Sequence, residues 1–197
     1  WNGADPKVRA GLEALGIATA VTPAEAARHL ARDRIVYLPL ERFHPALFHL
    51  LGLRDVLGLR SCVNTVCRML NPAGAPASVQ GVFHPSYRTL QADAAALLGW
   101  RDLSVIKGGG GEFERNPAKA ITGFGLRRGA PWETVFPTLQ EETRRLSDPT
   151  EPPAAIGRRD LPTFERAIVL GTAELALDTL GVPYPGETAR TLSSAPR

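Results

Sequence analysis

The feature that most restricts how this chain can fold is a run of four glycines, residues 108–111, directly after an apolar segment and a lysine. Val105 and Ile106 are β-branched, which is typical of a buried strand. Glycine permits positive φ angles and lets the backbone approach other groups closely. The pattern therefore predicts a strand that ends in a glycine-rich loop. Because ligands of open α/β sheets bind beyond the carboxyl ends of strands, Lys107 and the loop amides are candidates for an anion site.

A plain flexible connection is the alternative interpretation of the same loop. The lysine precedes the glycines, whereas a P-loop places Lys-Ser/Thr after them. The spacing and the helix start of a dinucleotide-binding fingerprint are also missing. On the loop alone, the anion site and the connection both remain open.

Positive charge is concentrated around this loop. The chain has 197 residues and a net charge of +3. Residues 105–128 contain five basic and two acidic side chains, so this segment alone carries a charge of +3. Mild basicity with such clustering is compatible with a polyanionic partner. The length predicts one domain, and we expect residues 1–197 to form a single α/β domain.

Cysteine usage and hydropathy restrict the compartment. Cys62 and Cys67 fit neither a zinc site nor a disulfide framework, so we expect reduced thiols in a cytoplasmic protein. Apolar runs are too short for a membrane span, and we expect no membrane partner. The sequence starts at Trp1 and its only methionine is Met69, so we expect that the native protein has residues before Trp1.

The alternation of strand and helix patterns predicts an α/β fold. Two Phe-His-Pro turns, at residues 43–45 and 83–85, each follow a predicted strand and precede a predicted helix. This order favours a mainly parallel sheet with helices on both faces and a β-hairpin at its edge. The predicted strands are 34–40, 78–83, 103–106, 121–126 and 132–136. The predicted helices begin at 6, 23, 46, 53, 87 and 164, with a loop at 147–162 and a last half-helix at 188–194.

One series of short motifs is similar to a known family. The series comprises Leu53-Arg54, Leu59-Arg60-Ser61, Asn64, Leu70-Asn71-Pro72, Ala75-Pro76 and Val79-x-Gly81-Val82-x-His84-Pro85. It resembles anthranilate phosphoribosyltransferase, of glycosyltransferase family 3, over roughly residues 12–180. The resemblance implies the α/β domain of that enzyme, without the family's N-terminal helical domain and its diphosphate-binding Gly-Thr-Gly-Gly-Asp loop. It also implies a homodimer for the full-length protein, formed through the helical domain.

The departures from the family pattern concern the donor site. The family's magnesium-binding Asp-Glu pair falls at Phe113-Glu114, and its Gly-Pro falls at Cys67-Arg68. A phosphoribosyl donor needs carboxylate-bound Mg²⁺ to neutralise its diphosphate, so replacement by Phe113 should weaken the site. The pattern resembles a divergent branch with a Lys-Gly-Gly-x-Gly-Glu loop, and this implies binding of a nucleic-acid phosphate backbone, DNA or RNA, without a cofactor.

Two functions follow from this resemblance, and no residue is assigned a catalytic role in either. In the first function, the protein binds nucleic acid through phosphate contacts, with little sequence specificity. The candidate contacts are Lys107, Gly108, Gly109, Gly110, Gly111, Arg115, Lys119, Arg127, Arg128, Arg68 and Arg88. In the alternative, an active phosphoribosyl or glycosyl transferase uses phosphoribosyl diphosphate and an aromatic acceptor. Its candidate acceptor residues are His44, Arg54 and Asn64, with Glu114 as the remaining Mg²⁺ ligand.

Plain structural roles compete with each assignment. His44 and His84 precede prolines and could simply hydrogen-bond a turn. The arginines could be solvated or ion-paired, and Glu112 and Glu114 could belong to an exposed charged loop. Trp100 and Trp132 are expected in the core or at its rim rather than as base-stacking residues.

Overall fold

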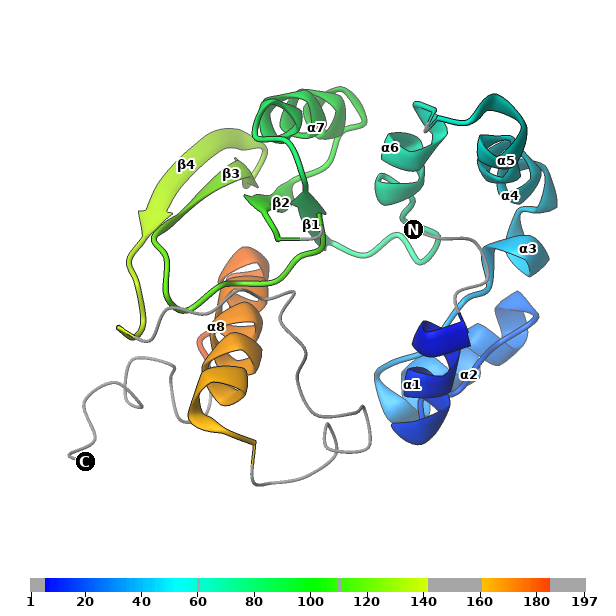
Figure 1. The fold of residues 1–197 in the computed structure, drawn as a ribbon, viewed down its shortest axis with the longest axis horizontal. Coiled ribbons are helices and arrows are strands. Elements are labelled where there is room, and N and C mark those ends of the chain that lie inside the picture. The colour runs from blue at the N-terminus through cyan, green and yellow to red at the C-terminus, as the bar shows by residue number, and fades with distance from the viewer. Residues whose placement is uncertain (1–5, 60, 110, 142–160, 185–197) are drawn as a thin grey trace. The chain divides into compact units, whose positions relative to one another are not determined.

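The computed structural model describes residues 6–59, 61–109, 111–141 and 161–184 (Figure 1). The contacts divide the chain into two compact units. Unit 1 comprises residues 1–70 and 151–159, and unit 2 comprises residues 71–150 and 160–197. The single domain over 1–197 stays a prediction. The predicted half-helix 188–194 and the predicted loop up to residue 160 lie outside the described residues.

Unit 1 is helical in its described part. Its helices are α1 (Pro6–Ala14), α2 (Pro23–Asp33), α3 (Leu40–Phe43), α4 (Pro45–Gly52), α5 (Arg54–Leu57) and α6 (Val63–Arg68). The capping box of α2 forms as its sequence dictates. The hydroxyl of Thr22 accepts the Glu25 amide at 3.2 Å, and the Glu25 carboxylate accepts the Val21 amide at 2.9 Å.

The predicted strand 34–40 is wrong. Arg34 ends α2 in the left-handed region, and only Tyr37 pairs, in an isolated parallel bridge with Thr19. Pro39 lacks an amide hydrogen and directly precedes α3, so a ladder could not continue through it. The β-branched pair Ile35-Val36 indicated local extension, but within segment 34–40 only Tyr37 has a strand partner.

Unit 2 contains one four-stranded sheet in the order β1-β2-β3-β4. The strands are β1 (Ala77–Val82), β2 (Asp102–Lys107), β3 (Ile121–Arg127) and β4 (Ala130–Phe136). The α/β class and the hairpin edge are confirmed, because β3 and β4 form an antiparallel pair with β4 outermost. The expected parallel majority needs correction: β1 and β2 are parallel, but β2 and β3 are antiparallel. The hairpin pairs directly with β2, and segment 34–40 adds no strand.

Helices cover both faces of the sheet, as predicted. Helix α7 (Ser86–Leu97) contacts β2 and β3, and α8 (Thr163–Leu180) contacts β1 and β2. Figure 1 shows these helices on opposite sides of the sheet. Alternation along β2 directs Leu103 and Val105 to the α7 face and Ser104 and Ile106 to the α8 face. All four side chains are completely buried, so the core of unit 2 lies on both sides of β2.

None of the helices in the described ranges is both long and apolar enough to cross a bilayer.

Candidate functional site

The glycine-rich loop begins at the carboxyl end of the parallel pair β1–β2. Lys107 is the last residue of β2, lies in register with Val82 of β1, and is exposed. The next amide, that of Gly108, donates to the Val82 carbonyl at 3.1 Å and thereby extends the ladder. This amide is used within the fold, so Gly108 does not offer it to a phosphate, and an anion site at Lys107 stays a prediction.

Glycine at this end of the sheet permits close backbone packing. A Cβ at Gly81 would lie 2.0 Å from the carbonyl carbon of Glu112, and one at Gly108 would lie 1.8 Å from its oxygen. Gly111 has φ of 85°. The chain therefore folds back over the end of β1 and β2 in a way that side chains would prevent. Gly110 lies outside the described residues.

The two carboxylates after the loop have different environments. Glu112 is exposed, whereas Glu114 and the intervening Phe113 are half-buried. Burial, and secondarily the charge of Glu112, raises the pKa of Glu114 above its usual range. Among the described residues, no group of three His, Cys, Asp or Glu side chains is arranged to hold a metal ion. Glu114 remains the residue that could contribute to Mg²⁺ binding under the transferase alternative.

Arg115 lies in the interior of unit 2. Its side chain is 4% exposed, and its Nη2 donates to the Pro137 carbonyl at 3.0 Å. Its guanidinium also lies 3.8 Å from the Glu174 carboxylate of α8 and 5.4 Å from the centroid of the Phe136 ring. The interactions hold the segment after the loop against α8 and β4, so Arg115 does not form part of an exposed phosphate-binding surface.

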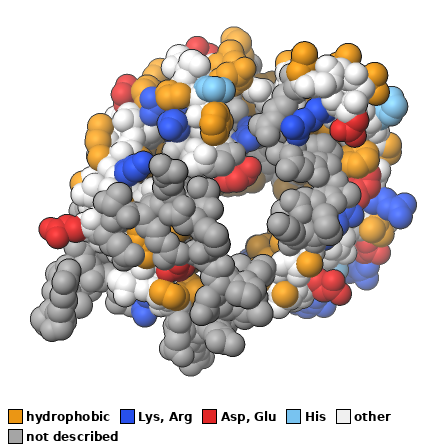
Figure 2. Space-filling model, in the orientation of Figure 1, with side chains coloured by type: hydrophobic (Ala, Val, Ile, Leu, Met, Phe, Trp, Pro, Cys, Tyr) orange, Lys and Arg blue, Asp and Glu red, His pale blue; other side chains and the backbone are white. Residues whose placement is uncertain are grey.

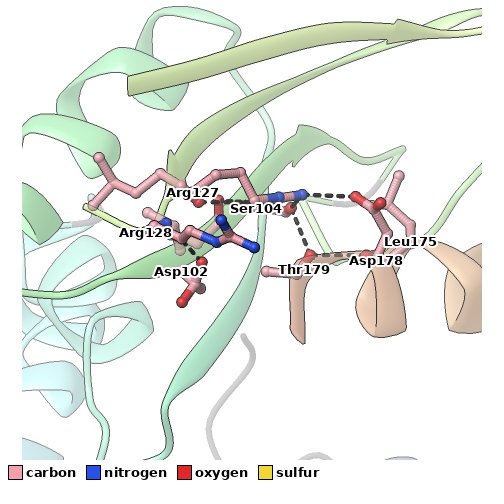
Figure 3. Close-up of polar contacts among 9 residues, drawn as sticks. Asp102, Ser104, Arg127, Arg128, Leu175, Asp178 and Thr179 are labelled. Atoms are coloured by element: carbon pink, nitrogen blue, oxygen red, sulfur yellow. Dashed lines mark hydrogen bonds and ion pairs between the residues drawn. The ribbon is translucent and has the colours of Figure 1, made fainter. Parts of the chain in front are cut away.

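Arg127 is part of a polar network between the sheet and α8 (Figure 3). Its Nη2 donates to the Ser104 hydroxyl at 3.0 Å and to the Asp178 carboxylate at 2.9 Å. The Ser104 and Thr179 hydroxyls are hydrogen-bonded at 2.6 Å inside the same interface. The guanidinium also lies 3.8 Å from the Trp132 ring centroid. The side chain of Arg127 thus stabilises the sheet–helix packing.

Three more of the predicted phosphate contacts, Lys107, Lys119 and Arg128, lie at the two ends of β2. Lys107 and Lys119 are exposed at the carboxyl end, where the turn of residues 116–119 leads into β3. Arg128 lies at the other end, where its amide donates to the carboxylate of Asp102, the first residue of β2, at 2.9 Å, and it is exposed. A strand of this length separates the two ends by roughly 17 Å. The sequence cluster is therefore divided in space.

Arg88 and Arg68 have structural partners of their own. The Arg88 guanidinium donates to the Thr122 carbonyl at 3.1 Å and lies 4.4 Å from the Phe124 ring centroid. Arg88 is half-buried at the same end of the sheet as Lys107. Arg68 belongs to α6 of unit 1, is half-buried and is also engaged in an interaction.

Three aromatic side chains at the carboxyl end of β1 were not singled out together by sequence reasoning. Phe83 is 55% exposed and Tyr87 is 38% exposed, with His84 between them. The Phe83 and His84 ring centroids are 4.9 Å apart at 87°. Their signal in the sequence was the Phe-His-Pro turn, which had been interpreted only as a strand-to-helix connection. We call Phe83, His84, Tyr87, Lys107 and Lys119 the carboxyl-end surface.

The acceptor candidates lie on three helices of unit 1. His44 precedes α4 and caps it, because its Nδ1 accepts the Leu47 amide at 3.1 Å. Arg54 begins α5 and Asn64 lies in α6, and both helices contact α4. Since α4 has eight residues, its length is about 12 Å, and His44 and Arg54 stand at its opposite ends. The fold of unit 1 does not bring these two side chains to the same end of the helix.

The two cysteines of unit 1 carry free thiols, as predicted. Cys62 is exposed and directly precedes α6, whereas Cys67 lies within this helix. Partial burial raises the pKa of the Cys67 thiol, which favours its neutral form.

Comparison with known proteins establishes the family. A family model described as "Glycosyl transferase family, a/b domain" matches residues 10–125. An anthranilate phosphoribosyltransferase of Methylibium petroleiphilum is 38% identical over 103 residues, which are 52% of this chain and 30% of that protein. The Thermus thermophilus enzyme of the same name is 31% identical over 166 residues, 84% of this chain and 50% of that protein. The chain therefore belongs to glycosyltransferase family 3, as an anthranilate phosphoribosyltransferase-like domain, and it spans a third to a half of these relatives.

Proposed function

We propose that this anthranilate phosphoribosyltransferase-like domain binds nucleic acid through phosphate contacts made by its carboxyl-end surface. The observation that carries the proposal is the position of Lys107 and Lys119, both exposed at the end of the sheet where open α/β folds bind their ligands. Neither lysine has a carboxylate within ion-pair distance in the described part of unit 2 that would neutralise it. Two free ammonium groups at such a position attract phosphates with little dependence on sequence.

The donor site is proposed to be degenerate. The resemblance places a magnesium-binding carboxylate at Phe113, a half-buried ring that cannot coordinate a cation. Its neighbour Glu114 is half-buried, and its pKa is raised, so ionisation of the remaining carboxyl is disfavoured. These two residues support nucleic-acid binding over phosphoribosyl transfer.

The test compares the removal of two positive charges at the carboxyl end of β2 with the removal of one at its other end. Lys107→Ala/Lys119→Ala should weaken binding to several unrelated fluorescein-labelled oligonucleotides by the same factor, since the contacts are made to phosphates. Arg128→Ala removes an exposed cation from the opposite end and should change the affinity by much less than half of that effect. Equal losses in the two variants would place the binding surface elsewhere and contradict the proposal.

A second candidate function rests on the relatives themselves. Those named above are anthranilate phosphoribosyltransferases, which favours an active transferase that takes phosphoribosyl diphosphate and an aromatic acceptor. His44, Arg54 and Asn64 would serve the acceptor side, and Glu114 with Mg²⁺ would serve the donor. Transfer to anthranilate by the purified chain would establish this alternative.

A further inference from the structure

The carboxyl-end surface exposes aromatic rings as well as cations. Phe83 is 55% exposed and Tyr87 is 38% exposed, although both are large side chains that gain free energy by burial. His84 joins them, with its ring centroid 4.9 Å from Phe83 and 6.3 Å from Tyr87. Aromatic rings gathered at the surface in this way offer faces on which another ring can stack.

The rings stand beside the proposed phosphate contact. Val82, the last residue of β1, is in register with Lys107, and Phe83 directly follows it in the chain. Helix α7 starts at Ser86, so Tyr87 lies in its first turn at the same end of the sheet. Figure 2 shows hydrophobic side chains interspersed with Lys and Arg on the part of unit 2 that carries α7. Aromatic rings and positive charge therefore lie at the same end of the sheet.

This combination discriminates between forms of nucleic acid. A single strand offers unpaired base faces that stack on aromatic rings while its phosphates meet lysines. In a duplex each base face is already covered by its neighbours, so the same rings gain no contact from it. A polyanion without bases would use the lysines alone.

We propose that Phe83 and Tyr87 stack on unpaired bases, so that the carboxyl-end surface binds single-stranded nucleic acid in preference to duplex. This inference rests on the proposed function and specifies its ligand. The His84 ring lies within aromatic-pair distance of both rings.

The experiment measures the affinity of the full chain for fluorescein-labelled oligo(dT) and for a duplex with the same number of phosphates per strand. Phe83→Ala and Tyr87→Ala should each weaken oligo(dT) binding on the order of 10-fold, while duplex binding changes less than about twofold. Leu97→Ala is the matched control, because Leu97 is 91% exposed near the other end of α7. Phe83→Trp keeps a stacking ring and should retain affinity, with fluorescence of the new indole quenched by oligo(dT).

The outcomes separate this inference from the function on which it rests. If the wild type binds both probes and Lys107→Ala weakens both, but the two aromatic variants bind as the wild type does, the stacking inference is wrong and phosphate binding stands. Equal losses for oligo(dT) and duplex in the aromatic variants would also overturn it. If the folded wild type binds neither probe at low salt, both proposals are wrong.

Discussion

Replacing Gly81 by alanine tests how the loop of residues 108–112 is held over the sheet. The new Cβ would lie 2.0 Å from the carbonyl carbon of Glu112 and 2.4 Å from the Phe113 nitrogen. Ordinary contacts need more than 3.4 Å, and both atoms belong to the backbone, so the loop would have to move by more than 1 Å. Overpacking of this kind costs about 1–3 kcal/mol, and a backbone clash belongs at the upper end.

A loss of about 3 kcal/mol should lower the melting temperature by roughly 6–12 °C for a chain of this size. Thermal unfolding followed by circular dichroism measures this shift. Hydrogen exchange at the Gly108 amide localises it, since this amide donates to Val82 across the same contact. Gly11→Ala is the control, because a Cβ there meets nothing within 4 Å and the residue lies inside α1. This substitution should raise stability by about 0.5–1 kcal/mol. An unchanged melting temperature and unchanged exchange in Gly81→Ala would refute the packing argument.

Three further predictions concern an ion pair, a half-buried carboxyl group and the transferase activity. In a double-mutant cycle, Arg127 and Asp178 should couple by about 0.5 kcal/mol, because Asp178 is 57% exposed and solvent screens the pair. Denaturant unfolding of the wild type, the two single variants and the double variant measures this coupling energy. A coupling energy of zero would show that the ion pair does not stabilise the fold. Glu114→Gln should stabilise the protein at pH 7, since burial raises the pKa of Glu114 and the folded state therefore favours its neutral form. This gain in stability over the wild type should disappear as the pH falls below the ordinary carboxyl pKa of about 4.3. If the melting temperatures of Glu114→Gln and wild type differed by the same amount at pH 7 and at pH 4, the prediction would be wrong. Finally, the chain should release no diphosphate from phosphoribosyl diphosphate with anthranilate and Mg²⁺, and measurable turnover would restore the transferase function.

Local signals in the sequence predicted much of the fold. The capping box of α2 and the glycine after α8 placed helix ends, because these signals act within a few residues. The hairpin was predicted from two short β-rich segments around a Gly-containing turn. The prediction of a strand at 34–40 was wrong because an extended backbone is a local property, whereas membership of a sheet depends on a partner strand far away in the sequence.

The site was predicted less well, because burial of a charge depends on elements far away in the sequence. Arg115 and Arg127 were counted with the surface cations, but Glu174 and Asp178 of α8 draw their guanidinium groups toward the helix. Nothing in the neighbourhood of either arginine in the sequence indicates these partners. The position of Lys107 could be predicted without such a distant partner, because the residue directly follows the apolar residues of a buried strand.

The salt dependence of binding tests the central claim most directly. Each phosphate contact on a single strand contributes about 0.7 to the slope of log affinity against log salt concentration. Titration by fluorescence anisotropy should therefore give Lys107→Ala/Lys119→Ala a slope flatter than that of the wild type by about 1.4. Arg128→Ala should keep the wild-type slope. Equal slopes for wild type and Lys107→Ala/Lys119→Ala would contradict phosphate binding at the carboxyl-end surface.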